Sequence, residues 1–464
     1  MRRMLNSSTK GTVRNLQGLL ESVVLTALYD IIWRNAYDSA LFSDYLGNSR
    51  YILMGVYVLL CMVVLRNTDG FTFGDLRRLE VAMAQWIGIV IINVITYLQL
   101  CLIARAMISP MPVVLLTVAE IIAVIPFVYL FNWLNQILYM PHKMLMIVGN
   151  REAVTLKLKM DSRRDKYLIK KMISADVDYE TLCKEILRYK SVVLNDIPAR
   201  KRNDILKFCY QHDIRVYVVP KLTDILMRGA DEVTTFDTPM VAVSGGGLTQ
   251  IQRILKRTLD IVLCLLAMVV AAPVMLAVAI AIKLDDGGPV FYKQKRVTVG
   301  GKEFDILKFR SMIVDAEKEG HSIPATGEDP RITKVGKVIR ACRVDELPQI
   351  LNILKGDMSI VGPRPERIEH VQAYSEEIPE FSYRLKVKGG LTGYAQIYGK
   401  YNTSAYDKLR LDLMYIENYS IFLDIKLIIM TLRILLKKES TEGFDVAAEN
   451  ESKKEELMKE LIKE

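Results

Sequence analysis

The chain begins with a series of predominantly apolar segments that are separated by short polar loops. The segment 84–104 has no charged residue, whereas Glu21 and Asp30 interrupt the segment 16–33. About 20 apolar residues are enough for a helix to cross the hydrocarbon layer of a bilayer. The first 140 residues are therefore predicted to form four transmembrane helices. The expected helices cover residues 16–33, 51–65, 84–104 and 111–131.

From residue 143 to about 250, short apolar runs alternate with charged helical stretches. Strands are expected over 144–148, 191–194 and 215–219, and helices over 178–189 and 198–212. Such alternation is typical of a small α/β domain. Gly149 follows the first expected strand, but the further glycines of a GxGxxG dinucleotide-binding turn are missing. A structural or regulatory domain is therefore favoured over dinucleotide binding.

A second apolar run, residues 261–282, has no charged residue and carries Pro273 near its middle. One interpretation is a fifth transmembrane helix with a proline kink. However, basic residues flank the run on both sides, at 256–257 and at 293–296, and basic flanks favour the cytoplasmic side. A helix that enters the bilayer, breaks at Pro273 and returns satisfies both observations. A re-entrant helix over 258–282 is the prediction.

The composition fits a membrane protein with large water-exposed parts. The 464 residues are 51% apolar and 25% charged, and the net charge is +9. This balance excludes a wholly disordered chain and a chain buried entirely in lipid. Basic residues precede the first apolar segment and follow the fourth, which favours the cytoplasm for both ends of the four-helix unit. The spacing of the six cysteines and four histidines indicates neither a disulfide framework nor a zinc site, and no signal peptide is evident.

The first candidate for chemistry is the pair Asp345 and Glu346. An apolar helical pattern over 350–354 follows the pair and ends at Gly356, a typical C-terminal cap. The two carboxylates are thus expected at the N-terminus of a short helix, where the helix dipole favours negative charge. Acidic residues are also common there as ordinary caps, so this motif alone leaves a structural and a catalytic role equally open.

Cations cluster in the sequence around this acidic pair. A short strand over 359–361 leads into GPRP, in which two prolines stiffen a turn that presents Arg364. A fixed guanidinium suits phosphate binding. Lys308 and Arg310 lie upstream, where a solvated amphipathic face is the alternative, and Arg340 lies just before the acidic pair. The set indicates metal-assisted phosphoryl chemistry, and no GxxxxGK[ST] motif of a P-loop enzyme is present.

The ordered series of motifs resembles the bacterial sugar transferase family, the polyprenyl-phosphate sugar-1-phosphate transferases. The resemblance covers residues 250–437, and the preceding half is similar to the extended members of that family, which have four membrane helices and a degenerate nucleotide-binding-like domain. The motifs are KRTLD at 256–260, GPVF at 288–291, KFRSM at 308–312, DELPQ at 345–349, GPRP at 362–365, LTGYAQ at 391–396 and DLMYIEN at 412–418.

The resemblance implies transfer of a sugar 1-phosphate from a UDP-sugar to undecaprenyl phosphate, which gives undecaprenyl-diphosphate-sugar and UMP. It favours UDP-glucose or UDP-galactose as donor, and exopolysaccharide or capsule assembly as destination. It implies that Asp345 is a nucleophile that forms an aspartyl-phosphosugar intermediate and that Glu346 is a Mg²⁺ ligand. The further residues that it places at the substrates are Arg340, Arg364, Lys308, Arg310, Pro363 and Asp412.

The expected fold is a membrane protein, α plus α/β. It comprises a transmembrane domain (1–140), a Rossmann-like cytoplasmic domain (141–248), a mainly helical monotopic catalytic domain (249–438) and a charged tail (439–464). The stretch 420–438 reads either as an interfacial amphipathic helix or as a core helix. One departure from the family is Gly389, where a proline is frequent, and glycine is expected to loosen that turn.

The expected setting is the bacterial cytoplasmic membrane, with the catalytic domain on the cytoplasmic face. The expected partners are the donor, the lipid acceptor and the bilayer, with a homodimer possible and no nucleic acid. Two other function classes are weighed against the transferase. A membrane-tethered nucleotide-sugar dehydratase or dehydrogenase needs glycines after Val148, and a non-catalytic scaffold does not need Asp345, Glu346 and Arg364 together.

Overall fold

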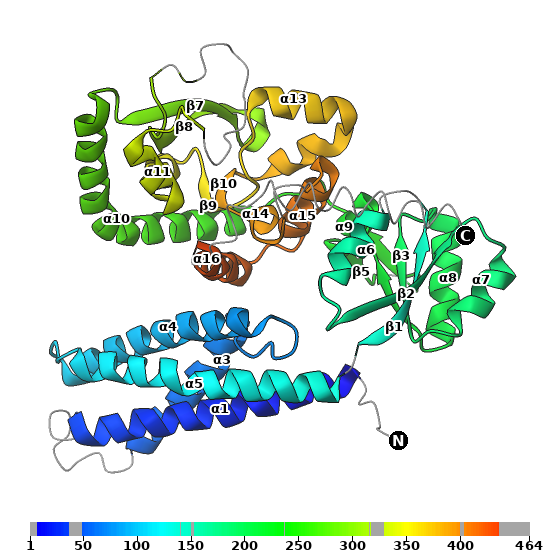
Figure 1. Ribbon diagram of the computed structural model, residues 1–464, viewed down its shortest axis with the longest axis horizontal. Coiled ribbons are helices and arrows are strands. Elements are labelled where there is room, and N and C mark those ends of the chain that lie inside the picture. Colours follow the sequence, from blue (N-terminus) through cyan, green and yellow to red (C-terminus); the bar gives the residue numbers. More distant parts are fainter. Residues whose placement is uncertain are drawn as a thin grey trace. The chain divides into compact units, whose positions relative to one another are not determined.

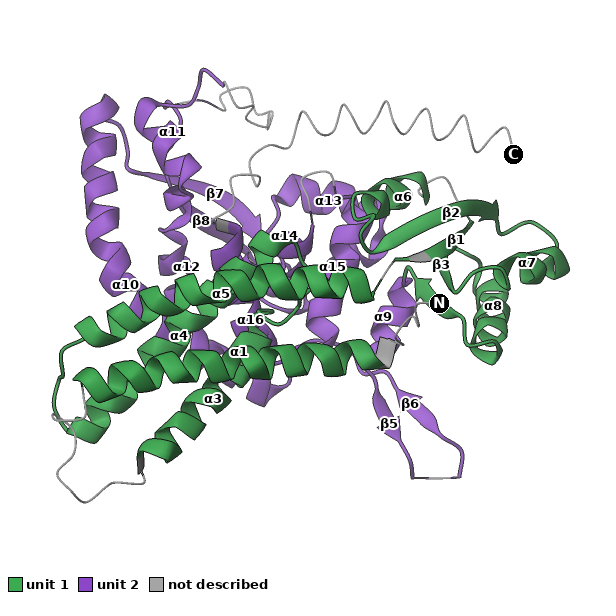
Figure 2. Cartoon of the chain, turned by 60° about the horizontal axis from the view of Figure 1, so that its bottom comes forward, with its two compact units in different colours: residues 1–219, 444–464 green, residues 220–443 purple. Residues whose placement is uncertain are grey.

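The computed structural model describes residues 7–36, 49–139, 141–149, 153–235, 237–314, 316, 329–399 and 403–435. The chain divides into two compact units, which Figure 2 shows in different colours. The described part of the first unit ends at Val219, and the second unit begins at Pro220. The domain boundaries expected at 140, 248 and 438 stay predictions, and the expected charged tail lies outside the described residues.

Four long helices form the N-terminal part of the first unit. They are α1 (Ser7–Ala36), α3 (Ser49–Asn67), α4 (Arg78–Ala104) and α5 (Met111–Leu138). Each apolar segment expected from the sequence is therefore helical. Their shared core includes the fully buried side chains of Trp33, Phe73 and Ile89.

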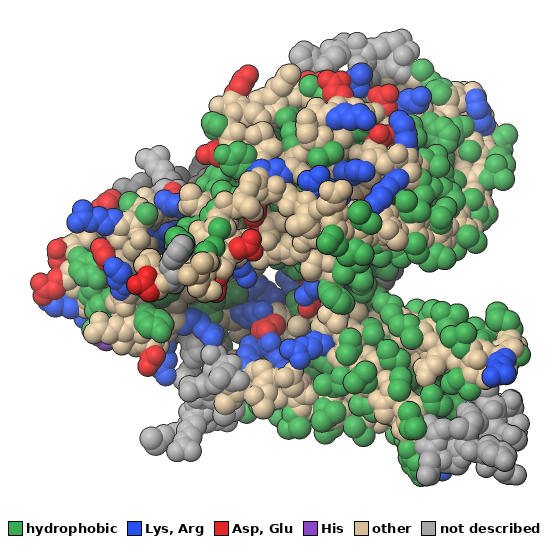
Figure 3. Space-filling view, turned by 180° about the vertical axis from the view of Figure 1, so that it is seen from behind, with side chains coloured by type: hydrophobic (Ala, Val, Ile, Leu, Met, Phe, Trp, Pro, Cys, Tyr) green, Lys and Arg blue, Asp and Glu red, His purple; other side chains and the backbone are tan. Residues whose placement is uncertain are grey.

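The outer surface of these helices is also apolar, as the space-filling view shows (Figure 3). Leu59, Leu98 and Ile122 are each more than half exposed. All four helices are long and apolar enough to cross a membrane. A bundle that is apolar both inside and outside is typical of a membrane protein, because lipid rather than water faces its surface.

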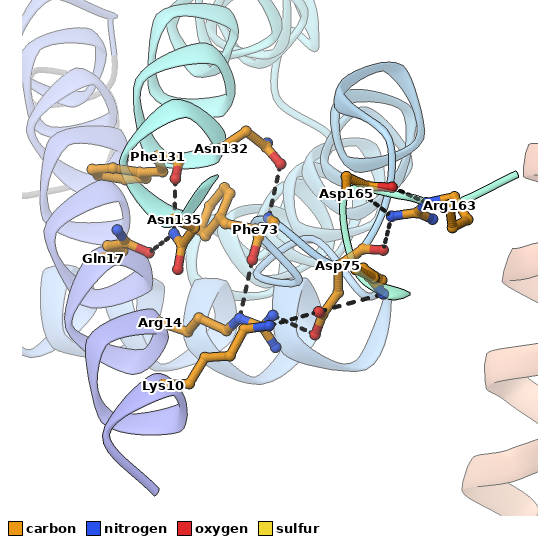
Figure 4. A network of polar contacts seen from close by, with 12 residues as sticks. Lys10, Arg14, Gln17, Phe73, Asp75, Phe131, Asn132, Asn135, Arg163 and Asp165 are labelled. Carbon is orange, nitrogen blue, oxygen red and sulfur yellow. Dashed lines mark hydrogen bonds and ion pairs between the residues drawn. The ribbon is translucent and has the colours of Figure 1, made fainter. Parts of the chain in front are cut away.

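An ion cluster around Asp75 lies at one end of the helical bundle (Figure 4). Lys10 and Arg14 of α1 pair with the Asp75 carboxylate, and Lys166 lies 3.4 Å from it. Burial alone would raise the pKa of Asp75, but these cations lower it to about 2. Arg163 donates a hydrogen bond of 2.8 Å to the Asp75 carbonyl oxygen. The cluster thus joins the loop after α3 to the turn that precedes the second strand of the sheet.

A four-stranded parallel sheet completes the first unit. Its order is β2 (Tyr167–Ser174), β1 (His142–Val148), β3 (Ser191–Asn195) and β4 (Arg215–Val218). Helices α6 (Ala153–Asp161), α7 (Tyr179–Ile186) and α8 (Ala199–Gln211) connect the strands. The three expected strands and both expected helices are confirmed. Strand β2 was not predicted, because Lys170 and Lys171 interrupt its apolar pattern.

Among its described residues, the second unit contains one long helix, several short helices and three small two-stranded sheets. It begins with α9 (Leu222–Arg228) and the hairpin of β5 (Asp231–Val233) and β6 (Met240–Ala242). The long helix α10 (Gln250–Asp286) leads into a second hairpin, β7 (Phe291–Val297) and β8 (Glu303–Phe309).

Helices α11 (Lys334–Ala341) and α12 (Gln349–Lys355) precede β9 (Ser359–Val361). The remaining elements are α13 (Ile368–Glu377), β10 (Gly390–Thr392), α14 (Tyr394–Tyr398), α15 (Ala405–Glu417) and α16 (Ile421–Leu435).

Helix α10 turns a corner along its length (Figure 1). The helix continues through Pro273, so the break expected there is a bend within one helical element. Proline removes a backbone donor and clashes with the preceding turn, which accounts for a bend. Cys264, before the proline, packs with Phe304 of β8, whereas Ile282, after it, packs with Phe309 of the same strand.

Helix α16 packs on the second unit, as one of the two interpretations of residues 420–438 expects, and the interfacial role stays a prediction. Leu427 and Met430 lie in the core of the second unit. Phe422 and Leu432, on other faces of the helix, are 73% and 49% exposed. The helix therefore packs on the unit with one face and presents apolar side chains with another.

Candidate active site

The acidic pair lies in a single 3₁₀ turn, Val344–Glu346, which directly precedes α12. The two carboxylates thus lie at the N-terminal end of the short helix, as expected, although in a separate 3₁₀ turn, because Pro348 takes the N-cap position of α12. Gly356 ends this helix in the left-handed conformation at φ 99°, as the sequence predicted. Arg343 at φ 54° adopts the same conformation without being glycine. Such backbone strain is frequent at functional sites.

Glu346 lies between two cations. Its Oε1 atom is 3.0 Å from Nζ of Lys308 and 3.3 Å from Nη2 of Arg364. Burial alone would raise the pKa of Glu346, but Arg364 and Lys308 lower it to about 2. Glu346 is therefore ionised at neutral pH, and its charge holds the Lys308 and Arg364 side chains in one place.

Asp345 has a different environment. Among the residues that the structure describes, no other side chain donates a hydrogen bond to its carboxylate, and the hydrogen-bond donor that lowers its pKa is its own backbone N–H. Burial raises the pKa of Asp345, the adjacent Glu346 raises it further, and Lys308 and Arg340 oppose the rise. Two neighbouring carboxylates with pKa values shifted in opposite directions are typical of residues with different catalytic tasks.

Lys308 reaches the acidic pair from β8, and α12 holds that strand. The Asn352 side chain accepts a hydrogen bond of 2.9 Å from the Leu307 N–H and donates one of 2.8 Å to the Asp305 carbonyl oxygen. Asn352 is buried and thus extends the strand pairing of β8 with a side chain. No sequence pattern predicts this role, because a lone asparagine within an apolar helix pattern has many possible partners.

The turn that carries Arg364 packs closely against β10. A Cβ atom on Gly390 would lie 2.1 Å from the Gly362 nitrogen, and one on Gly393 would lie 2.1 Å from the Gly362 oxygen. Only residues without a side chain permit this approach. The Pro363 side chain is buried, and its carbonyl oxygen accepts a hydrogen bond of 2.9 Å from the Gly390 N–H. Pro363 therefore shapes the turn, and the exposed Arg364 projects from it.

Gly389 does not leave this turn loose, contrary to the expectation. Its N–H donates to the Thr298 hydroxyl at 3.1 Å, and its carbonyl oxygen accepts from the Ser359 N–H at 2.9 Å. A Cβ atom at this position would lie 2.7 Å from the Pro365 side chain. Hydrogen bonds and close packing thus fix the turn that a proline would otherwise stiffen.

Asp412 lies behind the arginine turn rather than at its surface. Its side chain is 1% exposed and pairs with Arg384 at 2.8 Å, and Arg384 in turn donates to the Arg364 carbonyl oxygen at 3.0 Å. Burial raises the pKa of Asp412 to about 6, although Arg384 opposes the rise. The structure thus links Asp412 through Arg384 to the Arg364 turn, and the expected substrate contact of Asp412 stays a prediction. No sequence motif pointed to Arg384 as a member of this network.

Arg340 acts on the acidic pair in this structure, whereas Arg310 is bound elsewhere. Arg340, in the last turn of α11, is close enough to Asp345 to lower the pKa of that carboxyl. Arg310 is buried and pairs with Asp286 at the end of α10. Among the described residues Arg310 makes no bond to Asp345 or Glu346. Its expected substrate contact stays a prediction, and the structure shows a link between β8 and α10.

The donor set at the acidic pair fits a magnesium ion. Mg²⁺ is usually held by one or two carboxylates together with substrate phosphates and water, not by a cage of protein ligands. The described residues contain no group of three or more acidic, histidine or cysteine side chains that could form such a cage. Both cations that bind Glu346 contact its Oε1 atom, which leaves Oε2 for a metal beside Asp345.

Comparison with known proteins gives a family match over the region that carries this candidate site. The model of the bacterial sugar transferase family matches residues 251–438. A UDP-glucose:undecaprenyl-phosphate glucose-1-phosphate transferase of Caulobacter vibrioides is 40% identical over 191 residues, which are 40% of this chain and 71% of that protein. The chain therefore belongs to the bacterial sugar transferase family.

Two longer relatives are similar over the same region. A UDP-N-acetylgalactosamine-undecaprenyl-phosphate N-acetylgalactosaminephosphotransferase of Aeromonas hydrophila is 44% identical over 185 residues, which are 39% of this chain and 44% of that protein. A UDP-glucose:undecaprenyl-phosphate glucose-1-phosphate transferase of Escherichia coli is 41% identical over 211 residues, 44% of each chain. The similarity thus spans less than half the length of these two relatives.

Proposed function

We propose that the protein transfers a sugar 1-phosphate from a UDP-sugar to undecaprenyl phosphate, as the first step in assembling a capsule or exopolysaccharide. The observation that carries the proposal is the difference in environment between the two carboxylates of the 3₁₀ turn before α12. Glu346 is paired with Lys308 and Arg364, whereas no other side chain of the described residues forms a hydrogen bond or ion pair with Asp345. Relatives named for a glucose and for an N-acetylgalactosamine donor are about equally similar, so the sugar is open.

In the proposed mechanism Asp345 is the nucleophile. Its Oδ atom attacks the sugar-linked phosphorus of the donor, and the bond from that phosphorus to the bridging oxygen breaks as UMP leaves. An oxygen of undecaprenyl phosphate then attacks the same phosphorus and displaces the carboxylate. Carboxylates act as nucleophiles in such two-step transfers. Each step forms one P–O bond and breaks one, so the enzyme returns to its starting state.

Lys308, Arg340 and Arg364 bind and orient the donor diphosphate in this scheme. Their charges stabilise the negative charge that moves to the leaving group, which is the main task of a protein in phosphoryl transfer. Glu346 would hold Mg²⁺, which supplies further positive charge to the diphosphate when bound.

The bend of α10 supports a re-entrant rather than a spanning helix. Both arms of the helix contribute to hydrophobic clusters that include β8 of the same unit, whereas Leu265, Val269 and Leu276 are each more than half exposed. This apolar surface suits the interior of a bilayer. We place the second unit on the cytoplasmic face of the bacterial inner membrane, where UDP-sugars are available; assembly as a homodimer remains a further prediction.

The test is release of UMP by the purified full-length chain in detergent, with magnesium, undecaprenyl phosphate and a panel of UDP-sugars. Release from one donor that requires the lipid phosphate supports the transferase and identifies the sugar. Turnover of a UDP-sugar without UMP release, with a change in the sugar alone, would instead support the dehydratase or dehydrogenase alternative.

A further inference from the structure

One face of α10 binds both elements that carry the candidate site. Arg257 donates hydrogen bonds to the carbonyl oxygens of Ile353 and Leu354, at 2.5 and 2.7 Å. These carbonyls belong to the last turn of α12, whose groups have no partner within the helix. A cation is favoured at this end of a helix dipole. Arg257 thus fixes the helix that starts directly after the Asp345 and Glu346 turn.

Asp260 fixes the strand that leads to Arg364. Its Oδ1 atom accepts hydrogen bonds from the Ser359 hydroxyl at 3.1 Å and from the Ile360 N–H at 3.0 Å. Asp260 is 4% exposed and Ser359 is fully buried. Ile360 lies four residues before Arg364 in β9, which runs straight into the arginine turn. These bonds hold β9 in place, and the turn that carries Arg364 follows directly from this strand.

Residues 257 and 260 are three apart, so they lie on the same side of the helix, one turn from each other. The side chains of one rigid element therefore hold the C-terminus of α12 and the start of β9. Between these two attachments the chain reverses at Gly356, whose φ is 99°. Glu346 lies before the first attachment and Arg364 after the second, and their side chains meet at 3.3 Å.

We propose that Arg257 and Asp260 are positioning residues, which hold the acidic turn and Arg364 at their working separation and couple both to the membrane-inserted helix. This inference rests on the proposed transferase activity. Neither residue contacts the acidic pair directly. A small displacement of a binding group lowers catalysis steeply, by up to about a hundredfold for an error near 1 Å.

The test compares Asp260→Ala with Asp260→Asn in the full-length chain reconstituted in lipid nanodiscs. The asparagine amide oxygen can still accept both bonds, whereas alanine accepts neither. Thr258→Ala is the matched control, because Thr258 lies on the same helix turn and its hydroxyl bonds only to Ile254 of that helix. The readouts are kcat and KM for the UDP-sugar, and amide hydrogen exchange over residues 359–364.

We expect Asp260→Ala to lower kcat/KM by about tenfold or more and to raise KM, because Arg364 is displaced from the diphosphate. Exchange over 359–364 should accelerate in the same variant, while Asp260→Asn and Thr258→Ala stay close to wild type. Loss of folded protein would instead lower the apparent kcat and leave KM unchanged. The proposal is overturned if Asp260→Ala keeps wild-type kinetics, or if its exchange and KM do not change.

The exchange measurement separates this inference from the proposed function. A wild-type chain that releases UMP from no donor would contradict the transferase activity. The exchange difference between Asp260→Ala and Asp260→Asn would still decide whether α10 fixes the arginine turn.

Discussion

The Glu346 carboxylate and the Arg364 guanidinium meet at 3.3 Å, although 18 residues separate them in the chain. Lys308, from a third element, binds the same Oε1 atom. Glu346 thus holds cations from β8 and from the turn after β9 close to the carboxylate of Asp345. A diphosphate that enters this place meets two cations that are already positioned, which limits the reorganisation needed during reaction.

The geometry of Arg364 should matter as well as its charge. Arg364→Lys keeps the charge but loses the planar group of donors that matches two phosphate oxygens. We expect kcat/KM for the UDP-sugar to fall by about tenfold to a hundredfold. Arg200→Lys, a change at an exposed position of α8, serves as the control. Full activity of Arg364→Lys would show that only the charge is required.

The pH dependence should report Asp345. The nucleophile must be ionised, and its pKa is raised by burial and by Glu346, so kcat/KM should fall on the acid side at a higher pH than for an ordinary aspartate. Arg340 lowers this pKa. Arg340→Gln should therefore move the acid limb to still higher pH. The position of the limb is the readout, and an unmoved limb in this variant would separate Arg340 from Asp345.

The buried pair of Lys256 and Asp424 should contribute to stability. Its atoms are 2.6 Å apart, and the two side chains are 6% and 1% exposed. Lys256→Met leaves an unpaired buried carboxylate, which costs about 3–5 kcal/mol in comparable cases. We expect the free energy of unfolding in denaturant to fall accordingly. The double variant Lys256→Met with Asp424→Leu should recover part of this lost free energy. A double variant whose loss equals the sum of the two single-variant losses would contradict the pairing.

The close approach of β10 to the arginine turn gives a steric prediction. In Gly390→Ala the new methyl group would overlap the Gly362 nitrogen, so the turn must move. Since Arg364 projects from that turn, we expect kcat/KM to fall by about tenfold or more. Gly245→Ala is the matched control, because nothing lies within 4 Å of its Cβ position. Equal activity of both variants would mean that the turn adapts.

Local patterns predicted the long helices, the short helix with its Gly356 cap and the strand over 359–361, because periodicity and capping residues act within a few positions. The contacts that complete the site join distant segments. Asn352 binds β8 across more than 40 residues, and Arg384 links Asp412 to the Arg364 turn. Such pairings leave no periodic signal in one sequence. Arg310 was expected at the substrates because of the sequence motif in which it lies, whereas in the structure its side chain pairs with Asp286.

The most direct test of the account is capture of the covalent intermediate on Asp345. The full-length chain is incubated with magnesium and a UDP-sugar labelled in the sugar phosphate, without undecaprenyl phosphate. We predict that label stays on the denatured protein, that UMP is released in equal amount, and that added undecaprenyl phosphate removes the label. Asp345→Asn should retain none. Release of UMP only when the lipid phosphate is present, with an active Asp345→Asn variant and no label on the protein, would contradict the central claim.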